Sequence, residues 1–289
     1  MKIRAIIISL LLFSCTALSG APIVLDSVKF RGDVRKYYIG IPDNPAPGRP
    51  LVICLHGYGG SAEKYLDQKI TPACLGSGFA ICIPQGLKDP KGKNSWNVGY
   101  NPKQTGWKVD DVAFVAYLGR AVAKKYGLDA SNVFLTGMSN GGEMCYLTAY
   151  RRPEAFAAIA SVSGLQMDWM VRKYKPKGTV PFAELHGTAD KTSLWEGDPE
   201  NKYGWGKYLA VPAAVCNIVA MNGCVVYSKS SVPVRAEGNE VILHRYSGGN
   251  NGSEVLFYEV VGGTHSWCTD IYDSCGEILK FFTSHIRLH

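Results

Sequence analysis

Ser139 stands at the centre of the pentapeptide Gly-Met-Ser-Asn-Gly (137–141), directly after the apolar run 132–136 and before a helix-forming stretch. A serine on a tight turn between a strand and a helix is held in a strained conformation that presents its hydroxyl above the sheet. The flanking glycines let neighbouring backbone pass close by, and the N–H of the next residue, Asn140, points towards a reacting carbonyl oxygen. The pattern predicts a nucleophile for acyl transfer.

Two later segments offer an acid and a base for this serine. Asp190 ends the segment Leu-His-Gly-Thr-Ala-Asp (185–190), and His265 follows an expected strand at 254–261. Both come at the carboxyl ends of strands, where sites on open α/β sheets form. Because a serine hydroxyl is nearly inert until a base takes its proton, we expect His265 to be that base. Asp190 would hold the tautomer of the histidine and stabilise its imidazolium.

Other acidic residues and simpler interpretations compete with this assignment. Glu196 and Asp198 follow in the next loop, but Asp190 is better placed because it comes immediately after the strand. Asp110 and Asp111 are interpreted as charges at a helix N-terminus. The alternative for Ser139 is an ordinary turn serine, and the ordered partners downstream argue against it.

An earlier glycine-rich turn, Leu-His-Gly-Tyr-Gly-Gly (55–60), follows a buried strand. Backbone N–H groups approach a substrate only where side chains are absent. We therefore expect the N–H groups of Tyr58 and Asn140 to form an oxyanion hole for a tetrahedral intermediate. His56 and His186 are expected to order their turns by hydrogen bonding.

Strands alternate with helices along the chain, which predicts an α/β protein with a mainly parallel, doubly wound sheet. A helix over 111–126 has Asp110 as its N-cap and Gly127 as its stop, and a helix over 61–75 is expected to break near Pro72. A hairpin is expected over 27–41, further strands at 51–55, 79–83, 133–136, 157–162, 180–185, 225–228, 241–246 and 254–261, and helices after Ser139, over 211–222 and over 271–286. The connection 165–179 leaves little room for a large apolar lid.

The N-terminal residues 1–20 predict an export signal, in which Lys2 and Arg4 precede the apolar run 6–13. That run is too short to span a bilayer. Cleavage after Ser19 is one alternative, and lipidation of Cys15 as in a bacterial lipobox is another. Residues 21–289 are expected to form one catalytic domain, because no linker or repeat divides them.

Charge and cysteine content limit the partners. The formal net charge of +7 is a mild excess spread along the chain, and no patch of basic and aromatic residues predicts binding to nucleic acid. Export permits disulfides, and Cys216 with Cys224, or Cys268 with Cys275, are close enough in sequence to bridge, with the pairing left open. No His/Cys cluster has the spacing of a zinc site, so no metal is expected.

Tryptophans in the loops are candidates for binding the substrate, because an aromatic face stacks on sugar and phenolic rings. The candidates are Trp96, Trp195, Trp205 and Trp267, with Trp195 and Trp267 favoured because they are near Asp190 and His265 in sequence. The alternative is that these side chains pin their loops to the body of the protein by packing.

Seven motifs occur in one order: LHGYGGS at 55–61, WN at 96–97, VDDVAFV at 109–115, VFLTGMSNGGEM at 133–144, FAAIASVSG at 156–164, HGTAD at 186–190 and GGTHSW at 262–267. Together they resemble the polyhydroxybutyrate-depolymerase-like and feruloyl esterase group of α/β-hydrolases, in carbohydrate esterase family 1. The resemblance implies the α/β-hydrolase fold, a triad of Ser139, Asp190 and His265, and no cofactor. It also implies a secreted serine esterase that removes feruloyl or acetyl groups from plant xylan.

The chain departs from the depolymerase-type relatives in one place. Those relatives usually continue after HGTAD with a Val-Pro-Tyr-like segment, whereas residues 191–195 read Lys-Thr-Ser-Leu-Trp. This difference speaks against hydroxybutyrate polymer and leaves the acyl preference open. An esterase for short acyl or polyhydroxyalkanoate-type substrates is the alternative enzyme, and a catalytically silent carbohydrate-binding relative is the alternative from another class.

Overall fold

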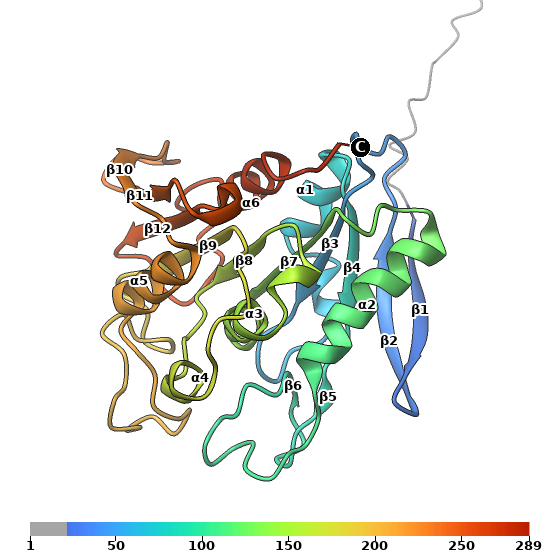
Figure 1. The fold of residues 1–289 in the computed structure, drawn as a ribbon, viewed down its shortest axis with the longest axis horizontal. Helices are drawn as coiled ribbons and strands as arrows, with labels where there is room; N and C mark the ends of the chain where they lie inside the picture. The colour runs from blue at the N-terminus through green and yellow to red at the C-terminus, as the bar shows by residue number, and fades with distance from the viewer. Residues whose placement is uncertain (1–21, 289) are drawn as a thin grey trace, which may run out of the picture.

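One ten-stranded sheet organises the protein, seen here in a computed structural model that describes residues 22–288. The strand order is β1-β2-β4-β3-β7-β8-β9-β12-β11-β10 (Figure 1). The central strands β4 to β12 in this order are parallel, and they span Ala80–Pro84 (β4), Leu51–Leu55 (β3), Val133–Met138 (β7), Ile159–Val162 (β8), Phe182–Gly187 (β9) and Val255–Val261 (β12). The carboxyl ends of these strands therefore meet at one edge of the sheet.

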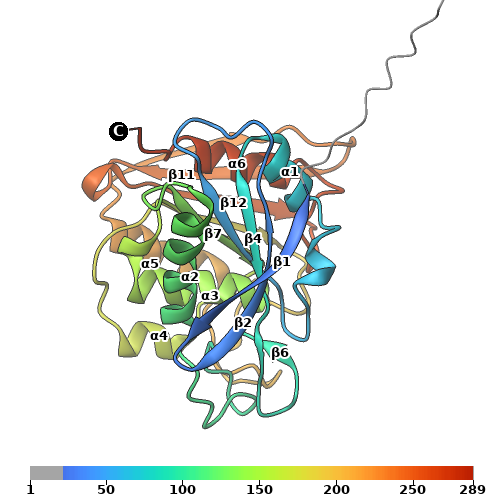
Figure 2. The same ribbon diagram turned by 90° about the vertical axis from the view of Figure 1, so that its right-hand side faces the viewer.

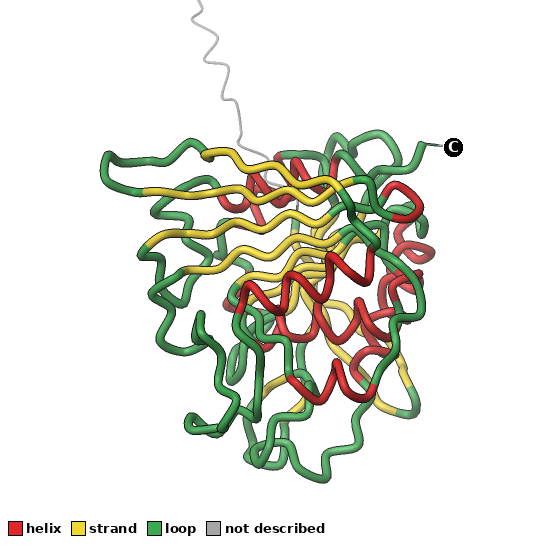
Figure 3. Tube along the Cα trace, turned by 60° about the vertical axis from the view of Figure 1, so that its left-hand side comes forward, coloured by secondary structure: helices red, strands yellow, loops and turns green. Residues whose placement is uncertain are grey.

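Antiparallel hairpins complete both sides of the sheet (Figure 3). On one side, β1 (Ile23–Phe30) and β2 (Asp33–Gly40) pair through β2 with β4. On the other, β11 (Glu240–Ser247) and β10 (Val226–Ser231) pair through β11 with β12. The mainly parallel sheet expected from the sequence is confirmed.

Helices cover both faces of the sheet (Figure 2). One face carries α2 (Asp111–Tyr126), α3 (Asn140–Arg151) and α5 (Val211–Asn222), and the other carries α1 (Ile70–Gly76) and α6 (Ser274–Thr283). In β3, Leu51, Ile53 and Leu55 belong to the core on the first face, whereas Val52 and Cys54 belong to the core on the second. Because successive side chains of a strand point to opposite faces, a strand buried on both faces is apolar throughout.

Local signals in the sequence determine the ends of α2. The side chain of Asp110 accepts a hydrogen bond from the Ala113 N–H at 3.2 Å, and Gly127 ends the helix in the left-handed region at φ 64°. An N-cap carboxylate satisfies an N–H that has no partner inside the helix, and glycine adopts a positive φ without steric cost. Both predictions for this helix are confirmed.

Two expected helix boundaries were wrong. The helix expected over 61–75 consists of a 3₁₀ turn at Glu63–Tyr65 and of α1, and Pro72 lies inside the first turn of α1. Proline is tolerated there because a first-turn N–H has no intrahelical partner to lose. The closing helix α6 begins at Ser274 rather than near residue 271, since Asp273 caps it by accepting a hydrogen bond from the Gly276 N–H.

The remaining short elements lie in the loops. They are β5 (Leu87–Lys88), β6 (Asn94–Ser95), α4 (Asp168–Lys173) and the 3₁₀ turns Pro153–Ala155 and Asn250–Gly252.

The eight cysteines within residues 22–288 are all unbridged, so neither expected disulfide is present there. The expected export signal at 1–20, with Cys15, lies outside the described residues. Within the described part of the chain, no helix combines the length and hydropathy needed to cross a bilayer.

Candidate active site

Ser139 lies between β7 and α3 with φ 57° and ψ −121°, in the region that non-glycine residues rarely occupy. The glycines around it have no room for a side chain. A Cβ on Gly137 would lie 2.7 Å from the carbonyl carbon of Gly141, and a Cβ on Gly141 would clash with the Leu55 carbonyl oxygen. The strained turn expected from the pentapeptide is therefore present, and close packing of α3 against β3 holds it.

Asp190 and His265 are brought together from the ends of β9 and β12. The Nδ1 atom of His265 lies 2.7 Å from Oδ2 of Asp190. The other carboxylate oxygen, Oδ1, accepts hydrogen bonds from the N–H groups of Thr192 and Ser193, each at 2.8 Å. Burial of the side chain would raise the pKa of Asp190, but these hydrogen bonds hold it below its ordinary value. The carboxylate is thus ionised and fixed in orientation.

The rival acids do not reach this histidine. Asp198 is buried, but its carboxylate accepts hydrogen bonds from the N–H groups of Lys202 and Tyr203 in its own loop. Glu196 is exposed on the surface. Among the candidate acids, the structure places only Asp190 in hydrogen-bond contact with His265 within residues 22–288.

Two buried residues that contact each other, Glu184 and His186, support the turn that carries Asp190. The ring of His186 bridges Oε1 of Glu184, 2.9 Å from Nδ1, and the Ser193 carbonyl, 2.8 Å from Nε2. Burial would lower the pKa of His186, but the hydrogen bond and the charge of Glu184 raise it. His186 thus orders the turn as expected, while the contribution of Glu184 was not foreseen from the sequence.

The turn 55–60 passes directly beside the serine. A Cβ on Gly57 would lie 3.4 Å from Cβ of Ser139 and 3.9 Å from its Oγ, so the backbone of Gly57 lies close to the serine side chain. The backbone N–H groups of Tyr58 and Asn140 have no hydrogen-bond acceptor within residues 22–288. Two unsatisfied N–H groups beside a serine hydroxyl are what an oxyanion hole needs.

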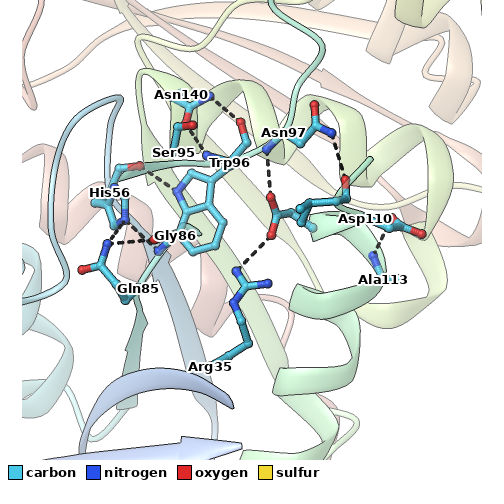
Figure 4. Close-up of polar contacts among 12 residues, drawn as sticks. Arg35, His56, Gln85, Gly86, Ser95, Trp96, Asn97, Asp110, Ala113 and Asn140 are labelled. Atoms are coloured by element: carbon cyan, nitrogen blue, oxygen red, sulfur yellow. Dashed lines mark hydrogen bonds and ion pairs between the residues drawn. The ribbon is translucent and has the colours of Figure 1, made fainter. Parts of the chain in front are cut away.

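His56 is a structural residue of this turn. Its Nε2 accepts a hydrogen bond from the Gly86 N–H at 3.0 Å (Figure 4). Its Nδ1 lies 2.8 Å from the Gly57 carbonyl. Burial lowers the pKa of His56 to about 4, so its ring is neutral near pH 7. Both ring nitrogens are occupied by hydrogen bonds, which leaves none for a base.

A small cavity opens beside Ser139. Its walls include Tyr100, Leu165, Thr192 and Trp205, and Glu143 lines it one helical turn after the serine. The carboxyl group of Glu143 accepts a hydrogen bond from the Tyr100 hydroxyl, and burial raises its pKa to about 8. Glu143 was not predicted as a site residue from the sequence, although residues four apart on a helix share one face.

The four tryptophans separate into one cavity residue and three packing residues. Trp205 lines the cavity, and the ammonium of Lys103 lies 3.2 Å from its ring centroid. Trp195 is half-buried and stacks on Phe257 at 5.6 Å between centroids. Trp96 has no exposed surface, and Trp267 is 8% exposed beside Tyr65. The expected substrate contacts at Trp96 and Trp267 are therefore wrong, because the fold buries both side chains.

The sequence of this chain is similar to those of proteins named as esterases. Residues 36–170 match the family model described as esterase PHB depolymerase. A putative esterase of Nocardia uniformis subsp. tsuyamanensis is 31% identical over 173 residues, which cover 57% of this chain and 48% of the relative. Feruloyl esterase B of Neurospora crassa is 33% identical over 132 residues, covering 45% of this chain and 44% of the relative. The chain spans about half the length of these curated relatives.

A solved structure shows the same fold across nearly the whole chain. The acetyl xylan esterase from Aspergillus awamori superposes with a TM-score of 0.55 over 90% of this chain and 99% of the other, at 20% sequence identity. At that identity the likeness concerns the fold. It confirms the α/β-hydrolase fold expected from the order of the motifs.

Proposed function

We propose that this chain, which has the α/β-hydrolase fold and is related to the esterases of carbohydrate esterase family 1, is a serine carboxylic ester hydrolase acting on acylated plant xylan. The family resemblance expected from the motifs is confirmed by the comparisons. The observation that carries the proposal is the hydrogen bond between Asp190 and His265, together with a strained serine at the carboxyl end of β7 in the same sheet. An arrangement that costs backbone strain is typical of a functional site.

In the first chemical step, His265 would take the proton of the Ser139 hydroxyl as its oxygen attacks the ester carbonyl. The negative charge that develops on the carbonyl oxygen would be held by the N–H groups of Tyr58 and Asn140. Asp190 would stabilise the imidazolium that forms. The histidine then gives its proton to the leaving alcohol, here a sugar hydroxyl, and the acyl group stays on the serine.

In the second step, water replaces the sugar. His265 takes a proton from the water, which attacks the acyl-enzyme carbonyl, and the same N–H groups hold the second tetrahedral intermediate. Collapse of that intermediate returns the proton to Ser139 and releases the carboxylic acid. Neither of the two proposed steps uses a metal ion or a cofactor.

The acyl group would be feruloyl or acetyl. Relatives of this chain include proteins named feruloyl esterase and a bifunctional acetylxylan esterase and xylanase. The connection 165–179 carries only the short helix α4, so we expect the site to be accessible to a polymer. We also propose export through the segment 1–20, since such a substrate lies outside the cell.

A side-by-side assay tests this assignment. Purified enzyme would be given methyl ferulate, acetylated xylan and poly-hydroxybutyrate, with the Ser139→Ala variant as background. We expect release of ferulate or acetate, and little soluble product from the polyester. Turnover confined to the polyester would favour the alternative esterase. Lack of turnover, together with lack of fluorophosphonate labelling at Ser139, would favour the silent carbohydrate-binding protein.

Trp205→Ala is expected to weaken hydrolysis of feruloylated xylan oligosaccharides more than hydrolysis of a small acetyl ester. Loss of an aromatic wall should cost about 1–2 kcal/mol in kcat/KM for the large substrate. Trp195→Ala is the matched comparison, because Trp195 stacks on Phe257 and does not line the cavity. It should lower thermal stability and affect both substrates equally. Equal losses for both substrates in Trp205→Ala would show that Trp205 only packs.

A further inference from the structure

We propose that the segment 94–97 sets the spacing between the two oxyanion donors, and that Trp96 and the side chain of Asn140 are its positioning residues. This inference rests on the proposed function, because it assumes that the N–H groups of Tyr58 and Asn140 bind the oxyanion. The two donors lie on separate turns, one after β3 and one after β7. A third part of the structure is needed to hold these two turns at a constant separation.

On one side, the segment is hydrogen-bonded to both flanks of Tyr58. The indole Nε1–H of Trp96 donates to the carbonyl of His56 at 2.9 Å (Figure 4). The Gly59 N–H donates to the carbonyl of Asn94 at 2.7 Å, and the Asn94 side chain donates to the Gly60 carbonyl at 2.9 Å. The turn that carries the Tyr58 N–H is thereby fixed both before and after that residue.

On the other side, the segment pairs with the side chain of Asn140. Its Oδ1 accepts a hydrogen bond from the Trp96 N–H at 2.7 Å, and its Nδ2 donates to the Trp96 carbonyl at 3.1 Å (Figure 4). The side chain of Asn140 has no exposed surface, so water does not compete for these groups. One residue, Trp96, is therefore bonded to both donor-bearing turns.

The segment itself is anchored to the body of the protein. The Asn97 N–H donates to Asp111 at 2.9 Å, and Asp111 forms a buried ion pair with Arg35 at 3.0 Å. The Gln104 side chain donates to the Trp96 carbonyl at 2.8 Å. Since breaking a buried ion pair leaves an uncompensated charge, this anchor resists movement. A rigid segment bonded to two turns keeps the distance between them constant.

The spacing matters because oxyanion donors act over a narrow range. They must lie about 2.7–3.1 Å from the oxygen of the tetrahedral intermediate rather than from the carbonyl oxygen of the bound ester. A small displacement of either N–H therefore weakens binding of the transition state while leaving binding of the substrate almost unchanged. Loss of positioning should consequently lower kcat and leave KM intact.

Trp96→Phe tests the inference, because phenylalanine keeps an aromatic ring in the buried site and removes the indole N–H. With p-nitrophenyl acetate as the probe, we expect kcat to fall about tenfold with KM within twofold of the wild type. Trp169→Phe is the matched control. It also removes an indole hydrogen bond to a loop carbonyl, Val98 at 3.1 Å, but that bond joins neither donor-bearing turn. Its kcat should equal that of the wild type.

Asn140→Asp gives a second test, since aspartate has nearly the same shape and lacks the Nδ2 donor. We expect a similar fall in kcat, and a double variant with Trp96→Phe whose loss is smaller than the product of the two single losses. Thermal unfolding of each variant separates positioning from a loss of folded protein. A kcat in Trp96→Phe equal to that of Trp169→Phe, or a loss confined to KM, would overturn the inference.

The rate of fluorophosphonate labelling separates this inference from the proposed function. The reagent places a phosphoryl oxygen in the oxyanion hole and needs no natural substrate. Slower labelling of Ser139 in Trp96→Phe than in Trp169→Phe would support the positioning role even if neither xylan ester is hydrolysed. Equal labelling rates would contradict it even if the wild type hydrolyses both.

Discussion

Ser139→Ala is expected to lower kcat for ester hydrolysis by a factor on the order of 10⁶, because members of a triad act as a unit. Alanine removes only the hydroxyl oxygen, so the turn between β7 and α3 should persist. The measurement is kcat on p-nitrophenyl acetate and on the best substrate of the side-by-side assay, with circular dichroism and thermal unfolding to confirm the fold. Residual turnover above a thousandth of the wild type would exclude Ser139 as the nucleophile.

Ser163→Ala is the matched control for this variant. Ser163 follows the neighbouring strand β8 and also has a positive φ, at 48°, but its side chain is buried. Removal of the Ser163 hydroxyl tests whether any strained serine at this end of the sheet contributes to kcat. We expect kcat close to that of the wild type, since a hydroxyl without access to solvent cannot attack a substrate. A loss as large as that of Ser139→Ala would contradict the assignment.

Asp190→Asn is expected to lower kcat by about 10⁴-fold. The structure shows why an isosteric change should be so costly. The N–H groups of Thr192 and Ser193 both donate to Oδ1, so the oxygen of the new amide must face them and its NH₂ must face His265. Nδ1 of the histidine then has to accept a hydrogen bond, which places its proton on Nε2. In that tautomer the ring cannot take the proton of Ser139.

Measurement of kcat between pH 7 and 8 checks this expectation, with Asp198→Asn as the control. Asp198 is equally buried, but its carboxylate bonds only within its own loop. The Asp198→Asn variant should have a lower stability than the wild type and a nearly unchanged kcat. Because the pKa of Asp190 lies below its ordinary value, its carboxylate should stay ionised when the wild type is acidified from pH 8 to 5. A larger loss in Asp198→Asn than in Asp190→Asn would identify the rival acid.

Much of the fold could be predicted because its signals are local. Asp110 and Gly127 delimit α2 through contacts within one helical turn, and the apolar runs of β3 and β4 reflect burial on both faces. The pentapeptide around Ser139 predicted the strained turn, since the steric demand lies in its own glycines. The catalytic roles of Ser139, Asp190 and His265 stay predictions until the variants are assayed.

The aromatic contacts could not be predicted from distance along the chain. Trp195 follows Asp190 by five residues, yet it stacks on Phe257 of β12, whereas the more distant Trp205 lines the cavity beside Ser139. The path of the loop 191–208 depends on contacts with another loop. Lys103 donates to the Gly204 carbonyl at 2.8 Å and lies over the Trp205 ring. Such contacts join segments that the local sequence does not relate.

The sequence by itself determined the order of strands and helices, the turn at Ser139, and the placement of Asp190 and His265 after strands, because each depends on neighbours in the chain. Only the tertiary structure decided which buried polar groups meet. Asp111 pairs with Arg35 across 76 positions, and Asn140 pairs with Trp96 across 44. A buried polar group needs a partner wherever the fold brings one, and no local pattern specifies a partner so far along the chain.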